Sequence, residues 1–557
     1  MLSRAVIAAT PATLLALAAC LFFLNKAYTI DDATFLLAAE HMLVDPLHPF
    51  AFDLVFHGIP TRASTNVTGP VMAVLLIPAV LAQGAEWLAH SVMLLVFVVG
   101  LVSSAALSLR LGTSDEGAAW VSLLVATSAA VLAMATTSMP DVPAMAFGAL
   151  GAERLLAFRS HRRAWTGIAA AVALALAVLS RLHLILAFIP LAGLLLPTWP
   201  HNLRAARDML LSRPFLVDVL PLAFALVLLW AVTSLTRDPQ TGMHFVGAVQ
   251  HNLQWPLLRV NVSQVPAQWV LAFPLGLAWS ALRGRQMLRS RSCWLGALIG
   301  VVLALLVPTA NGQWHRTLWQ APTTALGMAI LVDIAVDGWR RRDTVQICLL
   351  AWLLIAWPAA IYYHLPAKYL VPSAPAMALL VARQAEHGLP RTLARYMVAG
   401  VALVGLALGM AIAHADAALA EAGRIGGQTA AEYVKRGERV WYDGGWSFAW
   451  YARRAGARPM SIAPSLPEPG DVVVVGLASH LVAERCSNDQ LLQDVVIERP
   501  GGRIQDGAAG FYTNAVGYGT LPWIWRSKVP TATGDPGALL ASPLGSHVTV
   551  WRIGSCR

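Results

Sequence analysis

Two adjacent carboxylates, Asp31 and Asp32, follow directly after the first apolar run of the chain, residues 5–24. A carboxylate at such a position can take the proton of an attacking hydroxyl group and so act as a general base. Like charges side by side raise the pKa of one of them, which would tune that base upward. The alternative is structural, because Thr29 and the two acids could cap a helix over residues 33–43.

Composition places most of the chain in a bilayer. Of its 557 residues, 57% are hydrophobic and only 13% are charged, which excludes an ordinary soluble domain. We read the first apolar run as an uncleaved anchor because further spans follow it. Runs of suitable length predict thirteen helices, near 5–24, 90–109, 118–136, 142–158, 165–180, 183–197, 215–234, 267–282, 294–309, 318–336, 345–362, 369–383 and 396–414.

Basic residues alternate between successive connections of these spans. Arginines are concentrated in every second loop, around residues 154–163, 204–213, 283–291, 340–342 and 383–395. Cytoplasmic loops hold such an excess, so the N-terminus is predicted inside and the C-terminus outside. The formal net charge of +10 is then mostly a topology signal, and nucleic acid is not an expected partner. Alanine- and arginine-rich composition with short loops favours a bacterial inner membrane.

Two regions stand outside the expected spans. The first outer loop, about 25–90, contains apolar pieces at 33–43 and 70–81 that are too short to span and suit interfacial helices. The segment 416–557 is polar and strand-containing, and it predicts a small extracytoplasmic α/β domain after a membrane domain over 1–415. Cys486 and Cys556 lie in that segment, where they either pair in an oxidising compartment or stay free.

Several short motifs occur in one order and on one predicted side of the membrane. They are Ile30–Phe35 followed by Glu40–Leu43 and Asp45-Pro46, then Gly69-Pro70-Val71, Ser138–Pro143, Ser180-Arg181-Leu182 and Lys368–Pro372. Together they resemble the GT-C superfamily of integral-membrane glycosyltransferases, in particular the protein O-mannosyltransferase and lipid A aminoarabinose transferase group. The resemblance covers about residues 1–415. Some aminoarabinose transferases have an acidic–basic pair before the second interfacial helix, where this chain has Thr68-Gly69.

The resemblance implies transfer of a sugar from a polyprenyl-phosphate donor to a hydroxyl group of an extracytoplasmic lipid, glycan or protein, with inversion at the anomeric carbon. Asp31 is then the base, with Asp32 as its support or as the base itself. The leaving lipid phosphate needs cations where its charge grows. Outer-side residues beside span ends supply them: Arg181, Arg316 with His315, and Lys368 with Tyr369.

Each of these assignments has a structural alternative. Asp141 either supports the donor site or caps the helix after it. Arg181 and Lys368 could snorkel to anchor span ends, and Trp314-His315-Arg316 could belong to an interfacial belt. No metal site is predicted, although a divalent metal cofactor stays open. The competing functions are a multi-pass transporter, which internal repeats and midplane charges would favour, and a non-catalytic receptor that senses a ligand through residues 416–557.

Overall fold

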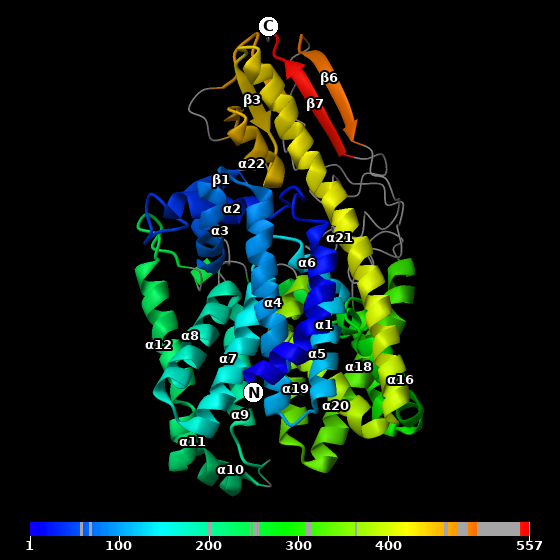
Figure 1. Cartoon of the computed structure of the whole chain (residues 1–557). Helices are drawn as coiled ribbons and strands as arrows, with labels where there is room; N and C mark the ends of the chain where they lie inside the picture. Colours follow the sequence, from blue (N-terminus) through cyan, green and yellow to red (C-terminus); the bar gives the residue numbers. More distant parts are fainter. Residues whose placement is uncertain are drawn as a thin grey trace.

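The computed structural model describes residues 1–55, 60–65, 69–198, 200, 202–244, 247–248, 253, 255–306, 314–362, 365–461, 466–476, 488–497 and 546–555. The fold is mainly helical, with a mixed sheet at the C-terminal end of the chain, as the sequence predicts (Figure 1). Cys486, Cys556 and the segment before Gly69 lie outside the described residues.

Long apolar helices form the body of the protein. Among the described residues, six helices are long and apolar enough to cross a membrane, or eight if each of two bent pairs is one span, so the expected number of thirteen is not confirmed. The six are α1 (Leu2–Leu21), α4 (Glu86–Arg110), α11 (Arg213–Asp218) with α12 (Leu220–Leu235), residues 321–341 of α18 (Trp314–Arg341), α19 (Thr344–Leu353) with η4 (Leu354–Ile361), and α21 (Arg391–Lys435). The bent pairs are α5 (Asp115–Thr127) with α6 (Ala129–Ala135), and α15 (Gln264–Leu271) with α16 (Leu275–Arg289).

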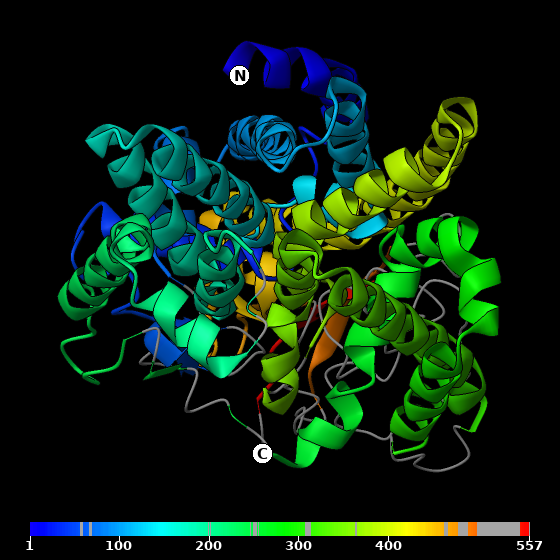
Figure 2. The ribbon, with the colours of Figure 1, turned by 90° about the horizontal axis from the view of Figure 1, so that it is seen from below.

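Further helices complete the bundle at the other predicted positions. They are α7 (Asp141–His161), α8 (Ala164–Ser180), η2 (Leu182–Ala187) with α9 (Phe188–Leu194), α17 (Arg291–Leu305), and η5 (Ala367–Ser373) with α20 (Ala374–Gly388). Shorter helices are α10 (Leu203–Leu210), η3 (Trp255–Leu257) and α14 (Leu258–Asn261). Seen from below, the helices of the first 180 residues occupy one side of the bundle and α16–α18 another (Figure 2).

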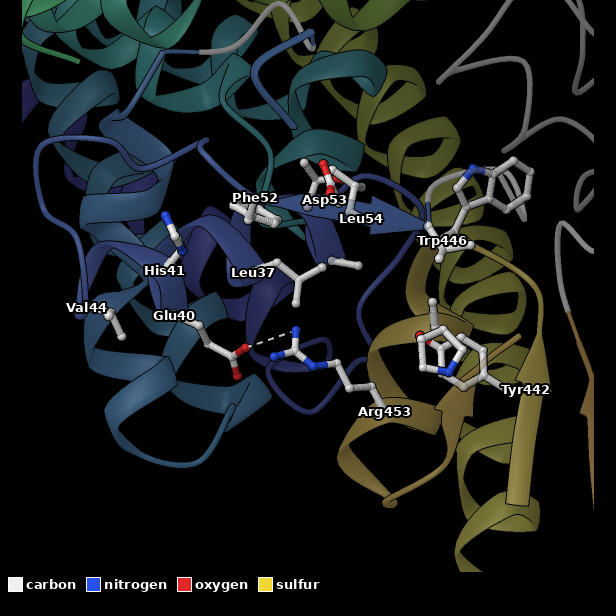
Figure 3. Close-up of a pocket in the computed structure, with 15 residues that line it drawn as sticks. Leu37, Glu40, His41, Val44, Phe52, Asp53, Leu54, Tyr442, Trp446 and Arg453 are labelled. Carbon is white, nitrogen blue, oxygen red and sulfur yellow. Dashed lines mark ion pairs between the residues drawn. The ribbon is translucent and has the colours of Figure 1, made fainter. Parts of the chain in front are cut away.

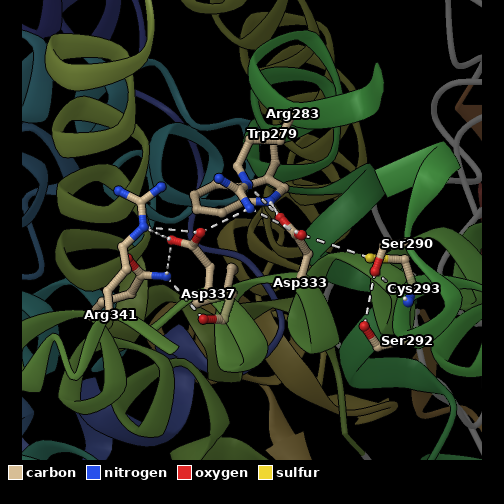
Figure 4. Close-up of polar contacts among 10 residues, drawn as sticks. Trp279, Arg283, Ser290, Ser292, Cys293, Asp333, Asp337 and Arg341 are labelled. Atoms are coloured by element: carbon tan, nitrogen blue, oxygen red, sulfur yellow. Dashed lines mark hydrogen bonds and ion pairs between the residues drawn. The ribbon is translucent and has the colours of Figure 1, made fainter. Parts of the chain in front are cut away.

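A buried ion-pair network joins α16 to α18 inside the bundle (Figure 4). The Arg283 guanidinium contacts Asp333 at 2.5 Å and Asp337 at 3.1 Å, and Trp279 Nε1 donates to Asp333 at 3.0 Å. Arg341 adds a second cation, 3.2 Å from Asp337. Buried charges need such partners, because an unpaired one costs several kcal/mol. This network therefore fixes how α16 and α18 pack.

The loop after α1 forms a layer between the bundle and the C-terminal sheet. It contains α2 (Asp32–Met42), the hairpin β1 (Asp53–Val55) and β2 (Pro60–Arg62), η1 (Ala63–Thr65) and α3 (Val71–Leu81). Both helices lie at the positions that the apolar pieces predict. Gly69, before α3, approaches α8 so closely that a Cβ would lie 1.8 Å from the Leu179 carbonyl oxygen. Only glycine permits that contact, which seats α3 on the bundle.

The C-terminal region is a five-stranded sheet in the order β4-β3-β5-β7-β6. Its elements are β3 (Val440–Asp443), α22 (Trp446–Arg454), β4 (Arg458–Pro459), β5 (Val472–Val475), β6 (Gln490–Ile497) and β7 (Ser546–Arg552). β3 pairs in parallel with β4 and β5, and β7 is antiparallel to β5 and β6. β3 and β5 are almost wholly buried; β3 packs against α21 and α22, and β5 packs against α21.

Helix α21 connects the bundle with this sheet (Figure 1). Its 45 residues correspond to about 68 Å, roughly twice the hydrocarbon thickness of a bilayer. The domain boundary expected near residue 415 therefore lies inside one continuous helix. The C-terminal region and α2 lie at one end of the bundle, and the arginine-containing α10 lies at the other. The orientation in the membrane stays a prediction.

Candidate active site

Asp31 is the N-cap residue of α2, yet its side chain makes no capping hydrogen bond. Its Oδ2 accepts instead from Lys368 Nζ at 2.6 Å. The Asp31 side chain is 26% exposed, whereas the Lys368 side chain is 2% exposed. The preceding residue, Ile30, has a φ of 25°, a strained value for a β-branched residue. The turn therefore presents one partly accessible carboxylate beside one buried cation.

Asp32 is fully buried and has a different environment. Its Oδ2 accepts from the Thr29 backbone N–H at 2.9 Å, and its Oδ1 accepts from the Ser138 N–H at 3.0 Å. Burial raises the pKa of Asp32 to about 7, against the opposing effect of the Thr29 hydrogen bond. With backbone donors on both oxygens, Asp32 joins the start of α2 to the Ser138–Asp141 segment.

Asp141 and Arg181 form a buried, bidentate ion pair. Arg181 Nε and Nη2 donate to the two carboxylate oxygens of Asp141 at 2.9 and 2.8 Å. Asp141 begins α7, and no side-chain cap is made at that helix start. Arg181 follows the last residue of α8 and is 8% exposed. The Asp141 carboxylate therefore binds Arg181 and makes no capping hydrogen bond. The Arg181 side chain points to Asp141 and does not snorkel toward the interface.

Lys368 and Tyr369 bring these pairs together from η5. The Arg181 guanidinium carbon lies 4.7 Å from the centre of the Tyr369 ring, a cation–π contact. Lys368 Nζ also lies 3.6 Å from the Met139 sulfur, and Arg181 interacts electrostatically with Asp31. Two cations, two carboxylates and a tyrosine from four distant segments thus share one site. An anion could bind between its cations, beside a carboxylate that can accept a proton.

A second buried ion pair, between Lys26 and Asp416, supports the turn before Asp31. Both side chains are 1% exposed, Lys26 Nζ also donates to the Thr136 carbonyl at 2.9 Å, and Thr29 Oγ1 donates to Asp416 at 3.2 Å. Asp416 comes from α21, so this helix holds the turn directly. The sequence motifs did not include Lys26. Its isolation just after the first apolar run was the available signal.

Arg316 and His315 lie in the first turn of α18, and their side chains are outside the described part of the structure. Their predicted contact with a donor phosphate stays a prediction. Among the described residues, no group of three His, Cys, Asp or Glu side chains could hold a metal ion. Tyr362, which sequence analysis did not single out, lies beside Tyr369 with ring centres 6.4 Å apart.

The chain is similar to proteins of known structure. No protein-family model and no curated protein matches the chain. Three of the solved structures that the chain resembles are those of ArnT, an archaeal oligosaccharyltransferase and the arabinofuranosyltransferase AftD. ArnT from Cupriavidus metallidurans, solved with undecaprenyl phosphate, is 14% identical over 88% of this chain and 96% of its own, with a TM-score of 0.43.

The other two proteins are longer than this chain. The Archaeoglobus fulgidus oligosaccharyltransferase, solved with a tethered acceptor peptide, is 11% identical over 82% of this chain and 63% of its own, with a TM-score of 0.43. The arabinofuranosyltransferase AftD from Mycobacteria is 14% identical over 99% of this chain and 40% of its own, with a TM-score of 0.46. These values are too low to transfer an activity or a residue role to this chain.

Proposed function

We propose that this protein is an inverting glycosyltransferase that moves a sugar from a polyprenyl-phosphate donor to a hydroxyl group outside the membrane. The contact between Lys368 and Asp31 carries the proposal, because it places a proton acceptor beside a cation. Transfer to a hydroxyl group needs both, one for the proton and one for the departing phosphate. Their position at the C-terminal-sheet end of the bundle suits a donor whose lipid tail stays in the bilayer.

The proposed reaction is a single displacement at the anomeric carbon. The acceptor oxygen forms the new bond to that carbon while the bond to the phosphate oxygen breaks, and the bonding electron pair leaves with the phosphate. Asp31 takes the acceptor proton. Lys368 and Arg181 stabilise the negative charge that grows on the lipid phosphate. Attack from the side opposite to the phosphate inverts the anomeric configuration.

The remaining site residues position this machinery. Asp141 holds the Arg181 guanidinium through two hydrogen bonds, and Tyr369 supports its face. Asp32, with both oxygens engaged by backbone N–H groups, fixes the turn that presents Asp31. We therefore assign the base role to Asp31 and a positioning role to Asp32. Arg316 and His315 remain proposed additional phosphate contacts.

The test compares cells that carry the wild type, a deletion and Asp31→Asn at matched expression. Lipid-linked sugars and envelope glycans are extracted and analysed by mass spectrometry. We expect the deletion and Asp31→Asn to remove the same sugar from an acceptor while the polyprenyl-phosphate sugar accumulates. Wild-type glycans and no donor accumulation in Asp31→Asn would refute the proposal. A receptor function would instead require residues 416–557 but tolerate Asp31→Asn.

A further inference from the structure

A pocket of about 470 Å³ lies between α2, the β1 hairpin and the C-terminal region (Figure 3). Helix α2 contributes Thr34 and His41, and Phe52, the residue just before β1, also lines the pocket. The C-terminal region contributes Tyr442 from the end of β3 and Trp446 from the start of α22. The volume falls within the range of roughly 300–1,000 Å³ that is usual for small-ligand sites. Both predicted domains are needed to enclose this space.

Two buried polar atoms on the α2 wall have no hydrogen-bond partner among the described residues. They are Thr34 Oγ1 and His41 Nε2, and Thr34 as a whole is only 4% exposed. Buried polar atoms in folded proteins are nearly always hydrogen-bonded. Both atoms belong to residues that line the pocket. Thr34 and His41 lie about two helical turns apart, on the same face of α2. They are therefore available to a polar ligand.

The other walls combine aromatic rings with charged groups of both signs. The His41 ring lies 5.3 Å from the Phe52 ring, and Tyr442 and Trp446 lie across the pocket. Glu40 contacts Arg453 at 3.5 Å (Figure 3) and also contacts Arg454 at 3.4 Å. An acyl chain would leave the Thr34 and His41 atoms unsatisfied. A phosphate would lie beside two carboxylates, because Glu40 and Asp53 both line the pocket. A sugar offers hydroxyl groups for the polar atoms and C–H faces for the rings.

We infer that this pocket binds a saccharide, and that the acceptor of the proposed transferase is therefore a glycan. The role of the glycan as acceptor rests on the proposed function. The saccharide-binding site itself is argued from the pocket residues alone. Thr34 follows Asp31 by three residues, about 4.5 Å along the axis of α2. A glycan seated against Thr34 and His41 would thus direct a terminal hydroxyl group toward the carboxylate. Because the pocket needs its C-terminal wall, the C-terminal region has to cover the layer that contains α2.

Direct binding is the first test. The full-length protein in lipid nanodiscs is mixed with methyl glycosides of hexose and pentose di- and trisaccharides, without donor, and saturation-transfer NMR and titration report binding. Thr34→Val and His41→Phe remove one polar atom each while they keep shape. Thr233→Val on α12 is the matched control, because its hydroxyl group bonds only within its own helix. We expect a bound glycan in the wild type and about tenfold weaker binding in both pocket variants.

A stability measurement separates a ligand role from a structural one. Because Thr34 Oγ1 has no partner among the described residues, Thr34→Val should unfold at the wild-type temperature or above it. Failure of every glycoside to bind, or unchanged affinity in Thr34→Val and His41→Phe, would overturn the saccharide pocket. In a transfer assay with a donor that carries a labelled sugar, transfer of the label to a protein or to a lipid that lacks sugar would refute a glycan acceptor.

Asp31→Asn distinguishes this inference from the proposed function. Glycan binding that persists in Asp31→Asn while transfer is lost agrees with both. Binding with undiminished transfer in Asp31→Asn would refute the proposed base and leave the pocket. Loss of transfer in Asp31→Asn, together with a wild-type KM for acceptor in the two pocket variants, would refute the pocket and leave the transferase. We expect those variants to raise the acceptor KM and leave kcat close to wild type.

Discussion

Lys368 Nζ lies 2.6 Å from Asp31 Oδ2, although 337 residues separate the two in the chain. The buried ammonium group orients the partly exposed carboxylate before any substrate binds. An anionic donor would compete for the same ammonium group, so donor binding and availability of the carboxylate are linked. A turn strained at Ile30 and anchored by Asp32 keeps this contact in place.

Replacing Asp31 tests the base directly. We expect Asp31→Asn to lower kcat for sugar transfer by about 10²- to 10⁴-fold, because an amide cannot accept the hydroxyl proton. Transfer is measured with purified protein in vesicles that contain the lipid-linked sugar. Asp45→Asn is the control, since that carboxylate is on the same outer segment and pairs with His48 at the surface. Equal losses in the two variants would contradict a specific role of Asp31.

Arg181→Lys tests the phosphate cation. Lysine keeps the charge but cannot form both hydrogen bonds to Asp141 or lie flat on Tyr369, so we expect a donor KM about tenfold higher. Arg436→Lys is a matched control, because Arg436 also lies 4.7 Å from a tyrosine ring, that of Tyr433, in an exposed position. Inhibition by free polyprenyl phosphate should weaken only in Arg181→Lys. An unchanged inhibition constant would argue against phosphate binding there.

The buried carboxyl group of Asp32 predicts a pH dependence of stability. Its pKa is near 7 in the folded protein and near 3.8 in the unfolded chain, so the folded state binds more protons between these values. The stability from this group is complete below about pH 4 and is lost as the pH rises through about 7. Thermal unfolding of the wild type and of Asp32→Asn from pH 4.5 to 8 should show a steeper decrease in the wild type. Parallel curves would contradict the raised pKa.

Removing one partner of the Lys26–Asp416 pair should be costly. Lys26→Met leaves a buried, uncompensated carboxylate, and we expect a loss of about 3–5 kcal/mol in the free energy of unfolding. The double variant Lys26→Met/Asp416→Leu should lose less than the sum of the single variants. Because Asp416 also holds Thr29, we expect both single variants to reduce transfer per folded molecule. Additive losses of stability would show that the two side chains are not coupled.

The Arg283 network offers a buried ion pair with no role in the proposed site. Arg283→Met leaves Asp333 without a cation, whereas Asp337 keeps Arg341, so the free energy of unfolding should also fall by about 3–5 kcal/mol. The kcat per folded molecule should stay at the wild-type value, which sets this variant apart from Lys26→Met. Unfolding and transfer are measured on the same preparations. A large decrease in kcat would show that the network acts on the site through the bundle.

The sequence alone determined the helical class of this protein and the position of its elements. Span-length apolar runs predict helices because backbone polar groups in a bilayer must bond within the segment, and a helix overlaps each predicted run. The sequence did not determine the number of spans, because two short helices joined by a bend, such as α5 with α6, are as apolar as one straight span. The sequence also did not predict that α21 is continuous, because its composition changes from apolar to polar along the helix while the backbone stays helical.

The tertiary structure alone decided which charged residues meet. The periodicity of apolar residues predicts which residues are buried. It does not predict the partner that a buried charge needs, because that partner can be hundreds of residues away in the chain. The motifs identified Asp31, Arg181 and Lys368 as candidates one at a time. Packing paired Asp31 with Lys368, turned Asp32 toward backbone N–H groups, and placed Thr34 and His41 on a pocket wall that the C-terminal region completes.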